Sequence, residues 1–136
     1  VYCGADDGFL YALDARTGDE RWVYQTGQWI WGRPLRVKDV LVVASADGVI
    51  HGVDAESGRK IWQRAAGSAL YADVVRSGGL ALAASTDGTL HSVVPETGDI
   101  AWRFRAESGI RAAPAVGADG VIYLPTCGGV LYALQA

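Results

Sequence analysis

The sequence predicts an all-β protein built from repeated antiparallel sheets, and three observations support this fold class. A pattern of turn residues and tryptophans recurs every 40 residues along the chain of 136 residues. The apolar runs between the turns are short, which suits strands better than helices. Glycine contributes 18 residues, tryptophan five and tyrosine six, a composition typical of short strands joined by tight turns.

The repeat is defined by a glycine turn near the start of each unit and a tryptophan near its end. The turns are Asp7-Gly8, Asp47-Gly48, Asp87-Gly88 and, in weaker form, Gly128-Gly129. The tryptophans are Trp22, Trp62 and Trp102, and one residue is inserted between Trp102 and Ile122. A unit of this length with four short strands is typical of one blade of a β-propeller.

Each full repeat is expected to contain four strands, which in the second repeat we place at residues 29–36, 40–45, 49–54 and 59–64. The Asp-Gly turn between the second and third strands predicts a type I′ hairpin, because both central residues of that turn need positive φ. The blades then cover about residues 1–27, 28–67, 68–107 and 108–136. The first blade lacks its first strand and the last lacks its fourth. About four blades of four-stranded antiparallel sheet should therefore form an open arc, a partial propeller.

The residues before each tryptophan carry a motif that resembles a known family. Residues 12–22 read ALDARTGDERW, residues 52–62 read GVDAESGRKIW and residues 92–102 read SVVPETGDIAW. These segments are similar to the tryptophan-docking motif, AxDxxTGxxxW, of the quinoprotein, or PQQ-like, β-propellers. The second copy changes the first Ala and the Thr, and the third loses the Asp. The resemblance covers nearly the whole chain and implies seven or eight blades in a complete ring.

The motif has a physical rationale, in which each tryptophan joins its blade to the next. An indole on the outermost strand can lie flat on the neighbouring blade while its N–H group donates to a carbonyl. The ring needs a small residue beneath it, and the repeat offers Gly32, Ala72 and Ala112. The residues expected to take this structural docking role are Trp22, Trp62, Trp102, Asp14, Asp54, Thr17, Ser57, Thr97, Gly18, Gly58 and Gly98.

For catalysis, the resemblance implies a calcium ion held by carboxylate and amide oxygens, an Asp base and often an adjacent cysteine pair. This sequence has no Asn, and Cys3 and Cys127 lie near opposite ends of the chain. We therefore expect no catalytic, cofactor-binding or metal-binding residue, and neither PQQ nor Ca²⁺. The cysteines are expected to be free, partly buried thiols, and His51 and His91 to pack in the core or at its rim.

The positions at which the repeats differ most form the candidate surface for a ligand or partner. On the first strand of each blade the apolar positions barely change, whereas the interleaved positions differ sharply. The candidate residues at these positions are Trp29, Trp31, Arg33, Tyr71, Asp73 and Arg111. At the start of the innermost strand they would line the mouth of the central funnel, and Trp, Tyr and Arg dominate protein contacts. The alternative is that repeats simply diverge wherever packing is loose.

Three functions are compatible with these features. The first is a non-catalytic PQQ-like module that serves as a protein- or ligand-binding scaffold, or as a sensor domain, of a larger protein or assembly. The alternative is a fragment of a quinone-dependent dehydrogenase whose catalytic residues lie on missing blades. A third is a structural fragment with no ligand. The lack of Asn and of adjacent cysteines favours the first function.

The open ends of the arc are expected to associate with further blades. Apolar residues such as Val1, Tyr2, Leu131 and Leu134 would be exposed there, and monomers rarely leave large apolar patches in water. The partner is either a second copy, with a two-fold dimer completing an eight-blade ring, or the rest of a longer propeller. The sequence begins without Met inside a strand-like run, so we expect a fragment or a processed product.

Charge and hydropathy argue against two other classes of partner. The net charge is −3 and the basic residues are scattered, which argues against a nucleic-acid surface. No apolar run approaches the roughly 18 residues of a membrane span. Localisation stays open at this stage, and the resemblance favours an extracytoplasmic or periplasmic site.

Overall fold

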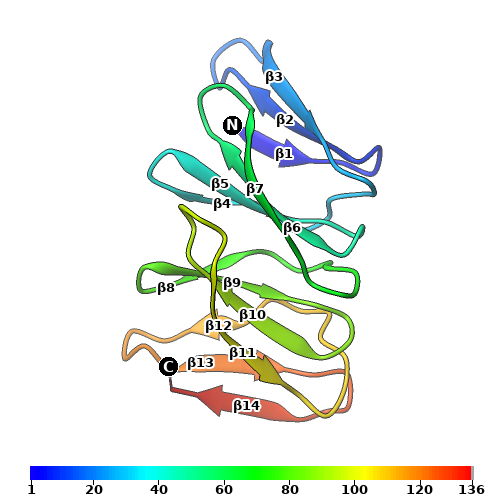
Figure 1. The fold of residues 1–136 in the computed structure, drawn as a ribbon, viewed down its shortest axis with the longest axis vertical. Helices are drawn as coiled ribbons and strands as arrows, with labels where there is room; N and C mark the ends of the chain where they lie inside the picture. The colour runs from blue at the N-terminus through cyan, green and yellow to red at the C-terminus, as the bar shows by residue number, and fades with distance from the viewer. Residues whose placement is uncertain (136) are drawn as a thin grey trace.

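The polypeptide forms four antiparallel sheets, here called blades 1 to 4, that follow one another along an open arc (Figure 1). The computed structural model describes residues 1–135, so Ala136, which ends the predicted fourth blade, lies outside the described residues. The strands are β1 (Tyr2–Gly4), β2 (Phe9–Leu13) and β3 (Glu20–Gln25) in blade 1; β4 (Leu35–Val37), β5 (Val40–Ala44), β6 (Val49–Asp54) and β7 (Lys60–Ala65) in blade 2; β8 (Val75–Ser77), β9 (Leu80–Ala84), β10 (Thr89–Val93) and β11 (Ile100–Arg105) in blade 3; and β12 (Ala115–Val116), β13 (Ile122–Pro125) and β14 (Leu131–Leu134) in blade 4. The predicted fold class is confirmed, with three strands in each end blade and four in each inner one.

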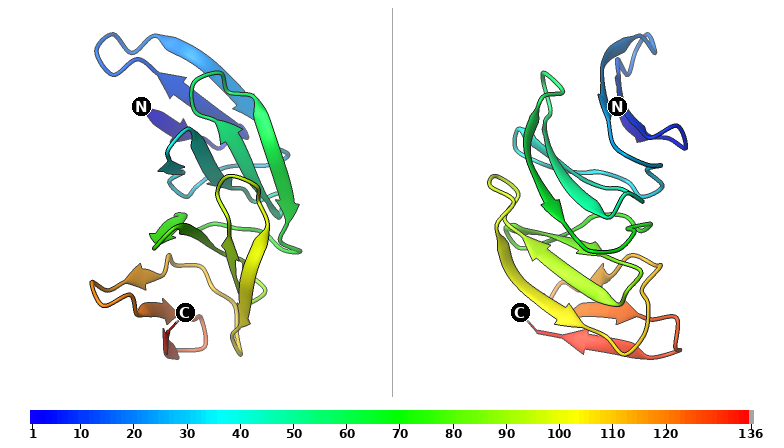
Figure 2. Two further views of the ribbon diagram at one scale, coloured as in Figure 1. Left: turned by 60° about the vertical axis from the view of Figure 1, so that its left-hand side comes forward. Right: turned by 45° about the vertical axis from the view of Figure 1, so that its right-hand side comes forward.

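Each blade is a meander whose strands pair in chain order, so its first and fourth strands form opposite edges of the sheet. In the left panel of Figure 2 the fourth strands β7 and β11 lie on the convex side of the arc, and β8 and β12 lie on the concave side. Residues 1–135 contain no helix that is long and apolar enough to cross a membrane.

The turns between the second and third strands differ from the prediction. Only their glycines have positive φ, at 85° for Gly8, 80° for Gly48 and 95° for Gly88, so the predicted type I′ geometry is wrong. In blade 2 the Gly48 N–H donates to the carbonyl of Ser45 over 3.2 Å. The Asp47 carboxylate accepts from the N–H of Val49 over 2.9 Å. A tight turn that ends on a left-handed glycine, braced by an Asp side chain, takes the place of the two-residue loop.

The first strand of blade 2 is shorter than predicted. β4 begins at Leu35, so residues 29–34 form a loop. Pro34 has no N–H to offer to a strand ladder. The loop backbone bonds instead to turns of two blades: the Ile30 N–H donates to the Ala5 carbonyl over 3.0 Å, and the Trp29 carbonyl accepts from Ala46 N–H over 3.0 Å. The loop therefore rests on a fixed base, which matters for the candidate site below.

The hydrophobic core lies between the blades, in three clusters that each join neighbouring sheets. One register position of the third strand is occupied by Leu10, Ile50 and Leu90, and each of these side chains is fully buried. β5 and β10 are buried along their whole length. Continuous burial is typical of a sheet that is covered on both faces.

The residues beneath the indoles are glycines of the docking motif itself, Gly58 and Gly98, rather than members of the predicted set Gly32, Ala72 and Ala112. A Cβ atom on Gly58 would lie 2.6 Å from the Trp22 ring, and one on Gly98 would lie 2.4 Å from the Trp62 ring. The glycine of the following Ser-Gly or Thr-Gly turn therefore lies under each indole, since only a residue without a side chain leaves room for the ring.

The indole N–H groups of the same two tryptophans donate to carbonyl oxygens of the next blade. The Trp22 Nε1 atom lies 3.2 Å from the Ala55 oxygen, and the Trp62 Nε1 atom lies 2.8 Å from the Pro95 oxygen. Each indole thus combines burial of its ring with a satisfied polar edge.

The small residues predicted to lie beneath the tryptophans have another role. A Cβ atom on Gly32 would lie 2.1 Å from the Ala72 carbonyl oxygen, so this glycine allows two loops of neighbouring blades to approach closely. Ala112, the third member of the set, is exposed. The prediction that these residues support the indoles is therefore wrong.

Two of the four apolar residues expected at the open ends are exposed. Val1 and Leu131 are each 66% exposed. Tyr2 and Leu134 are half-buried instead, because Tyr2 packs against Trp22 at a ring-centroid distance of 5.8 Å and Leu134 packs against the core between blades 3 and 4. The strand alternation decides this, since successive side chains point toward opposite neighbours.

Candidate functional site: an aromatic surface across blades

The loops that enter the first strands bring three of the predicted aromatic residues together. The rings of Trp29 and Trp31 stack with centroids 5.0 Å apart, and Trp31 lies 4.9 Å from the ring of Tyr71 on the next blade. Trp29 is 39% exposed and Trp31 is 54% exposed. We call these three residues the aromatic surface. It presents large rings to solvent on a rigid all-β base.

Polar contacts fix the aromatic surface to the neighbouring blades. The Trp31 Nε1–H donates to Asp6 Oδ1 of blade 1 over 2.6 Å. On the other side, the Arg33 backbone N–H donates to Asp73 Oδ1 over 2.8 Å and its Nε–H to Asp73 Oδ2 over 2.9 Å. These hydrogen bonds, the backbone one first, hold the pKa of Asp73 below its usual value. The site therefore spans blades 1 to 3.

Arg111, the remaining predicted residue, differs from the others in having no polar partner. It is exposed and makes no hydrogen bond or ion pair with residues 1–135. The structure thus brings five of the six predicted residues into two contacting groups, the aromatic surface and the Arg33–Asp73 pair. Because the Arg33 side chain is 88% exposed, that ion pair orients the loop more than it stabilises the fold.

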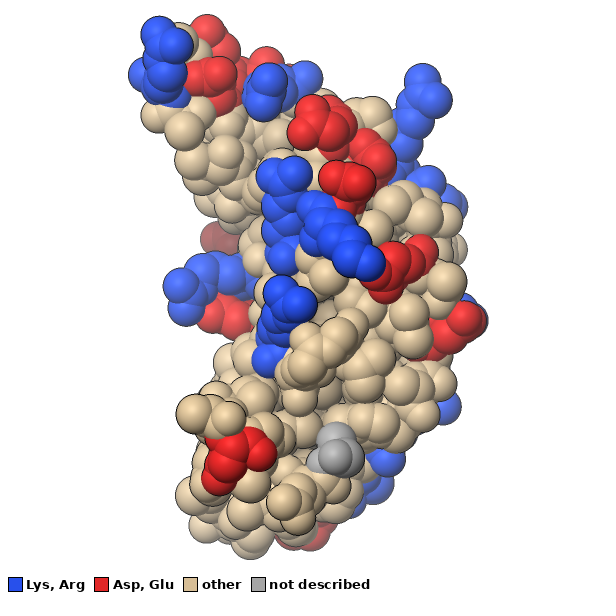
Figure 3. All heavy atoms as spheres, turned by 90° about the vertical axis from the view of Figure 1, so that its left-hand side faces the viewer, with Lys and Arg blue, Asp and Glu red and all other residues tan. Residues whose placement is uncertain are grey.

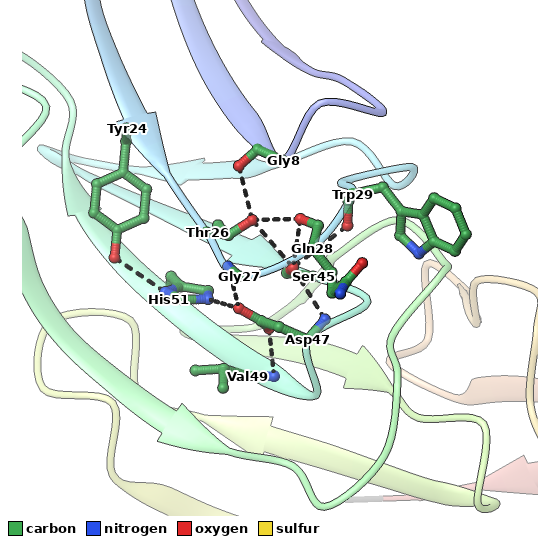
Figure 4. A network of polar contacts seen from close by, with 10 residues as sticks. All are labelled: Gly8, Tyr24, Thr26, Gly27, Gln28, Trp29, Ser45, Asp47, Val49 and His51. Carbon is green, nitrogen blue, oxygen red and sulfur yellow. Dashed lines mark hydrogen bonds and ion pairs between the residues drawn. The ribbon is translucent and has the colours of Figure 1, made fainter.

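A buried hydroxyl network supports the loop from below (Figure 4). The Thr26 hydroxyl lies 2.9 Å from the carbonyl oxygen of Gly8 and 2.6 Å from that of Gln28, and it can donate to either. The Ser45 hydroxyl lies 3.2 Å from the Gln28 carbonyl and 3.3 Å from that of Trp29. Figure 4 shows the Trp29 indole pointing away from this network, so its backbone is fixed while its ring stays free.

Sequence reasoning missed this network, although one signal was present. In three repeats a hydroxyl residue stands two positions before the Asp-Gly or Gly-Gly turn. These residues are Ser45, Ser85 and Thr126. A polar residue repeated at the end of an otherwise apolar strand indicates a buried hydrogen-bonding role.

His51 belongs to the same buried region. Its Nε2 atom lies 3.1 Å from Asp47 Oδ2 and its Nδ1 atom lies 3.0 Å from the hydroxyl of Tyr24. Since the carboxylate can only accept, we assign the proton to Nε2, and Nδ1 accepts from Tyr24. Burial holds the pKa of His51 below its usual value and raises that of Tyr24. His51 thus links blades 1 and 2 as a neutral imidazole.

His91 occupies the equivalent position of blade 3, with different partners. Its Nε2 atom lies 3.3 Å from the Ser85 hydroxyl and its Nδ1 atom lies 3.4 Å from Arg103 Nε. Burial lowers its pKa as well. Ser85 is fully buried, so no substrate could reach its hydroxyl. Residues 1–135 contain no group of three or more His, Cys, Asp or Glu side chains that could hold a metal ion.

The two cysteines are free, as expected, but their predicted partial burial is wrong. Cys3 and Cys127 are both exposed. Both lie in end blades, and the positions equivalent to Cys3 in the next two blades are Val43 and Ala83, which are buried. A missing neighbour at the end of the arc, rather than the residue type, explains the exposure.

Charge is distributed unevenly over one face of the molecule. Figure 3 shows Lys and Arg mixed with Asp and Glu at the upper end of this face, a run of Lys and Arg down its middle, and fewer charged side chains at the lower end, where blade 4 lies.

Comparisons with known proteins place these features in a family context. A family model described as outer membrane protein assembly factor BamB matches residues 1–79 and 47–136. The structure of BamB from Moraxella catarrhalis is 30% identical and superposes with a TM-score of 0.87, covering 98% of this chain and 42% of that chain. This chain therefore spans less than half the length of that relative. No curated protein matches it.

Two further structures resemble the chain in fold alone. The computationally designed Ika4 protein is 16% identical with a TM-score of 0.84, covering 98% of this chain and 82% of that one. A chain of the Mitotic Checkpoint Complex is 15% identical with a TM-score of 0.84, covering 99% of this chain and 45% of that one.

Proposed function

Because this chain belongs to the BamB-like family of PQQ-like β-propellers, we propose that it is a non-catalytic module that binds protein partners through the aromatic surface. The matched family is named for an assembly factor rather than for a catalyst. The single observation that carries the proposal is the contact of Trp29, Trp31 and Tyr71, which leaves two tryptophans exposed on an anchored loop. The module would act as a scaffold, or as a sensor domain, of a larger protein or assembly.

Physical chemistry favours this surface as a protein contact. Tryptophan and tyrosine bring large apolar area with few rotatable bonds, so little conformational entropy is lost on binding. Asp6 fixes the Trp31 ring before a partner arrives, and the hydroxyl network fixes the loop backbone. A surface that is already ordered loses less free energy on association. Arg33, two residues after Trp31 on the same loop, offers a charged group to an acidic or carbonyl-rich partner.

The donor groups do not fit a quinone-binding calcium site. The motif carboxylates are engaged within their own turns: Asp14 Oδ1 accepts from the N–H groups of Arg16 over 2.8 Å and Thr17 over 3.1 Å. These hydrogen bonds hold the pKa of Asp14 below its usual value. Calcium needs six to eight oxygen ligands, and the full sequence contains no Asn. The proposal therefore includes no PQQ and no Ca²⁺.

A selection experiment tests the proposed surface. Peptides from a randomised library displayed on phage are selected on the wild-type chain and then measured against Trp31→Ala and against Ile61→Ala. Ile61 is the matched control, because it is 45% exposed and lies on β7, away from the aromatic surface. We expect Trp31→Ala to weaken binding of the selected peptides by about tenfold or more, and Ile61→Ala to leave it unchanged.

Two results would contradict the proposal. Selected peptides whose affinity is insensitive to Trp31→Ala and Trp29→Ala would place the binding surface elsewhere. Saturable quenching of tryptophan fluorescence by PQQ with Ca²⁺ would favour the alternative, a fragment of a quinone-dependent dehydrogenase.

The open ends of the arc provide a second surface for association. Either a second copy, which would complete an eight-blade ring, or the remaining blades of a longer propeller would cover these ends.

A further inference from the structure

The three rings of the aromatic surface form a column. The rings of Trp29 and Trp31 are stacked with an interplanar angle of 25°, and those of Trp31 and Tyr71 are tilted by 39°. Trp29 and Tyr71 do not pair with each other among residues 1–135, so Trp31 lies between them. A partner that contacts all three rings must therefore run along the column, from the loop of blade 2 to that of blade 3.

Each end of the column carries a hydrogen-bond donor that has no acceptor. The indole N–H of Trp31 donates to Asp6, whereas the Nε1 atom of Trp29 and the hydroxyl of Tyr71 make no hydrogen bond within residues 1–135. Figure 4 shows that the Trp29 indole points away from the buried hydroxyl network. A partner that satisfies both donors must offer acceptors near both ends of the column, and free backbone carbonyls are acceptors of this kind.

The backbone of the loop at residues 29–34 does not offer a partner a strand to pair with. The Trp29 carbonyl and the Ile30 N–H are bonded to turns, and the Arg33 N–H donates to Asp73. Pro34 has no N–H group. The addition of a partner strand needs a row of free backbone groups at a sheet edge. The side chains of the column must therefore make the contacts with the backbone of the partner.

The length of the column matches one turn of a polyproline II helix. The centroid distances of 5.0 Å and 4.9 Å place Trp29 and Tyr71 at most about 10 Å apart, and a polyproline II helix advances about 9 Å per turn of three residues. An α-helix repeats a face over a similar length, about 10 Å for seven residues. Its carbonyls are bonded within the helix, however, and would leave both donors without an acceptor. The carbonyls of a polyproline II helix are free.

We propose that the aromatic surface binds a proline-rich segment in the polyproline II conformation, with prolines three positions apart against Trp29 and Tyr71. This inference rests on the protein-binding function proposed above and names the class of partner. The proline rings pack on the aromatic rings, while carbonyls of the segment accept from the Trp29 indole and the Tyr71 hydroxyl. Proline suits this contact because its ring is apolar and its φ is fixed, so less conformational entropy is lost on binding. Aromatic surfaces on other folds recognise proline-rich segments in this way.

Fluorescence anisotropy of labelled peptides tests the inference. The probe is a fluorescein-labelled peptide of about twelve residues, roughly four turns of polyproline II helix, with proline at every third position and serine elsewhere. The control peptide has the same composition in an order that places no two prolines three positions apart. We expect the wild-type chain to bind the probe at least about tenfold more tightly than the control peptide. Ile61→Ala should leave both affinities unchanged.

Conservative variants separate the donor groups from the rings. Trp29→Phe and Tyr71→Phe each keep an aromatic ring and remove a free donor, so each should weaken binding of the probe about two- to tenfold and leave the melting temperature unchanged. Trp31→Ala interrupts the column and should weaken binding by about tenfold or more. Affinity for the probe that is unchanged in both Phe variants would overturn the proposal.

The peptide selection described above separates this inference from the function on which it rests. Selected peptides that require Trp31 and carry prolines three positions apart would support both. Selected peptides that require Trp31 but carry no such pair, together with equal affinities for the probe and the control peptide, would overturn the polyproline II partner and leave the binding surface in place. Peptides insensitive to both Trp31→Ala and Trp29→Ala would overturn the proposed function, and this inference with it.

Discussion

Trp62 and Trp102 stand at the same position of successive repeats, yet their surroundings differ. Trp62 is 8% exposed, lies over Gly98 and donates its indole N–H to the Pro95 carbonyl over 2.8 Å. Trp102 is half-buried and makes no indole hydrogen bond within residues 1–135. A cavity of about 330 Å³ lies beside it, lined by Trp102, Phe104 and Leu134 among others. The motif specifies the tryptophan, but the turn of the next blade determines how far the ring is buried and whether its N–H group has an acceptor.

The comparison shows that the burial of each indole depends on the blade that follows it. In repeat proteins of this kind each unit depends on its neighbours, so inner units are more stable than end units. The following predictions test how far the inner and end contacts differ, from the largest expected effect to the smallest.

Removing an inner tryptophan should have the largest effect. Trp62→Ala is expected to lower the free energy of unfolding by about 3–5 kcal/mol, since it removes a buried ring and leaves a cavity. Trp102→Ala should lower it by only about 1–2 kcal/mol, because less area is buried there. Trp29→Ala, on the exposed loop, should cost about 1 kcal/mol or less. Urea unfolding measures all three, and equal losses would contradict the structural distinction.

The glycine beneath the indole separates backbone strain from ring contact. Gly98 and Gly18 both have positive φ, at 73° and 78°. A Cβ atom on Gly98 would collide with the Trp62 ring, whereas one on Gly18 would meet nothing within 4 Å. Gly18→Ala should therefore cost about 1–2 kcal/mol from strain alone.

Gly98→Ala should cost about 1–3 kcal/mol more than Gly18→Ala, because the ring must also move. Thermal unfolding of the two variants gives this difference. If both variants lost the same amount, the indole contact would contribute nothing.

Acidification should destabilise the inner blades through their histidines. Burial keeps the pKa of His51 and His91 below the usual 6.5, so the unfolded chain takes up protons first as pH falls. Stability is therefore full above about pH 6.5 and declines as pH falls through the lowered pKa, by at most about 1.4 kcal/mol per pH unit for each histidine. Urea unfolding midpoints measured between pH 7 and pH 5 test this prediction. This pH window lies above the usual pKa values of carboxyl groups, so their titration contributes little.

The end blades suggest the matched variant for this measurement. They carry Tyr11 and Tyr132 at the histidine position, and the Tyr11 hydroxyl donates to Asp7 over 2.5 Å, as His51 does to Asp47. His51→Tyr with His91→Tyr should flatten the pH dependence in this window. An unchanged slope in the double variant would assign the effect to other groups.

The smallest expected effect concerns a strained turn at the concave edge. Lys38 has φ of 53°, and the equivalent residue of blade 3 is Gly78, with φ of 59°. Lys38→Gly should raise the free energy of unfolding by about 0.5–1 kcal/mol, since a side chain disfavours this conformation. The lost ion pair with Glu96, 3.2 Å long and well exposed, should matter little. Differential scanning calorimetry measures the change, and a lower melting temperature would show that the ion pair outweighs the strain.

The sequence predicted the inner strands of a blade well, but the turn geometry and the contacts between repeats poorly. The expected strands at 40–45 and 49–54 match β5 and β6 to within one residue. In contrast, the glycine beneath Trp22 is Gly58, 36 positions away, and no pattern around either residue identifies the pair. The expected strand start at residue 29 was wrong because hydrogen bonds to two blades hold that loop.

The candidate site shows the same division. The divergence of the repeats identified Trp29, Trp31 and Tyr71, and the structure brings their rings into contact. Their role in binding stays a prediction. Thr26 and Ser45, which support the loop, were not predicted, although the hydroxyl of Ser45 recurs as Ser85 and Thr126. His51 was expected to pack in the core or at its rim, and it is buried, but its contacts with Asp47 and Tyr24 depend on the neighbouring blade.

By itself the sequence determined the all-β class, the four blades and the order of their strands. Strand alternation and glycine turns act over a few residues, so a period of 40 residues reports them directly. Only the tertiary structure decided which side chains are buried. Leu90 and Leu131 have the same side chain and the same register, and one is fully buried while the other is 66% exposed. The hydrophobic contribution of a side chain depends on the area its neighbours cover, and in a propeller those neighbours belong to the next blade.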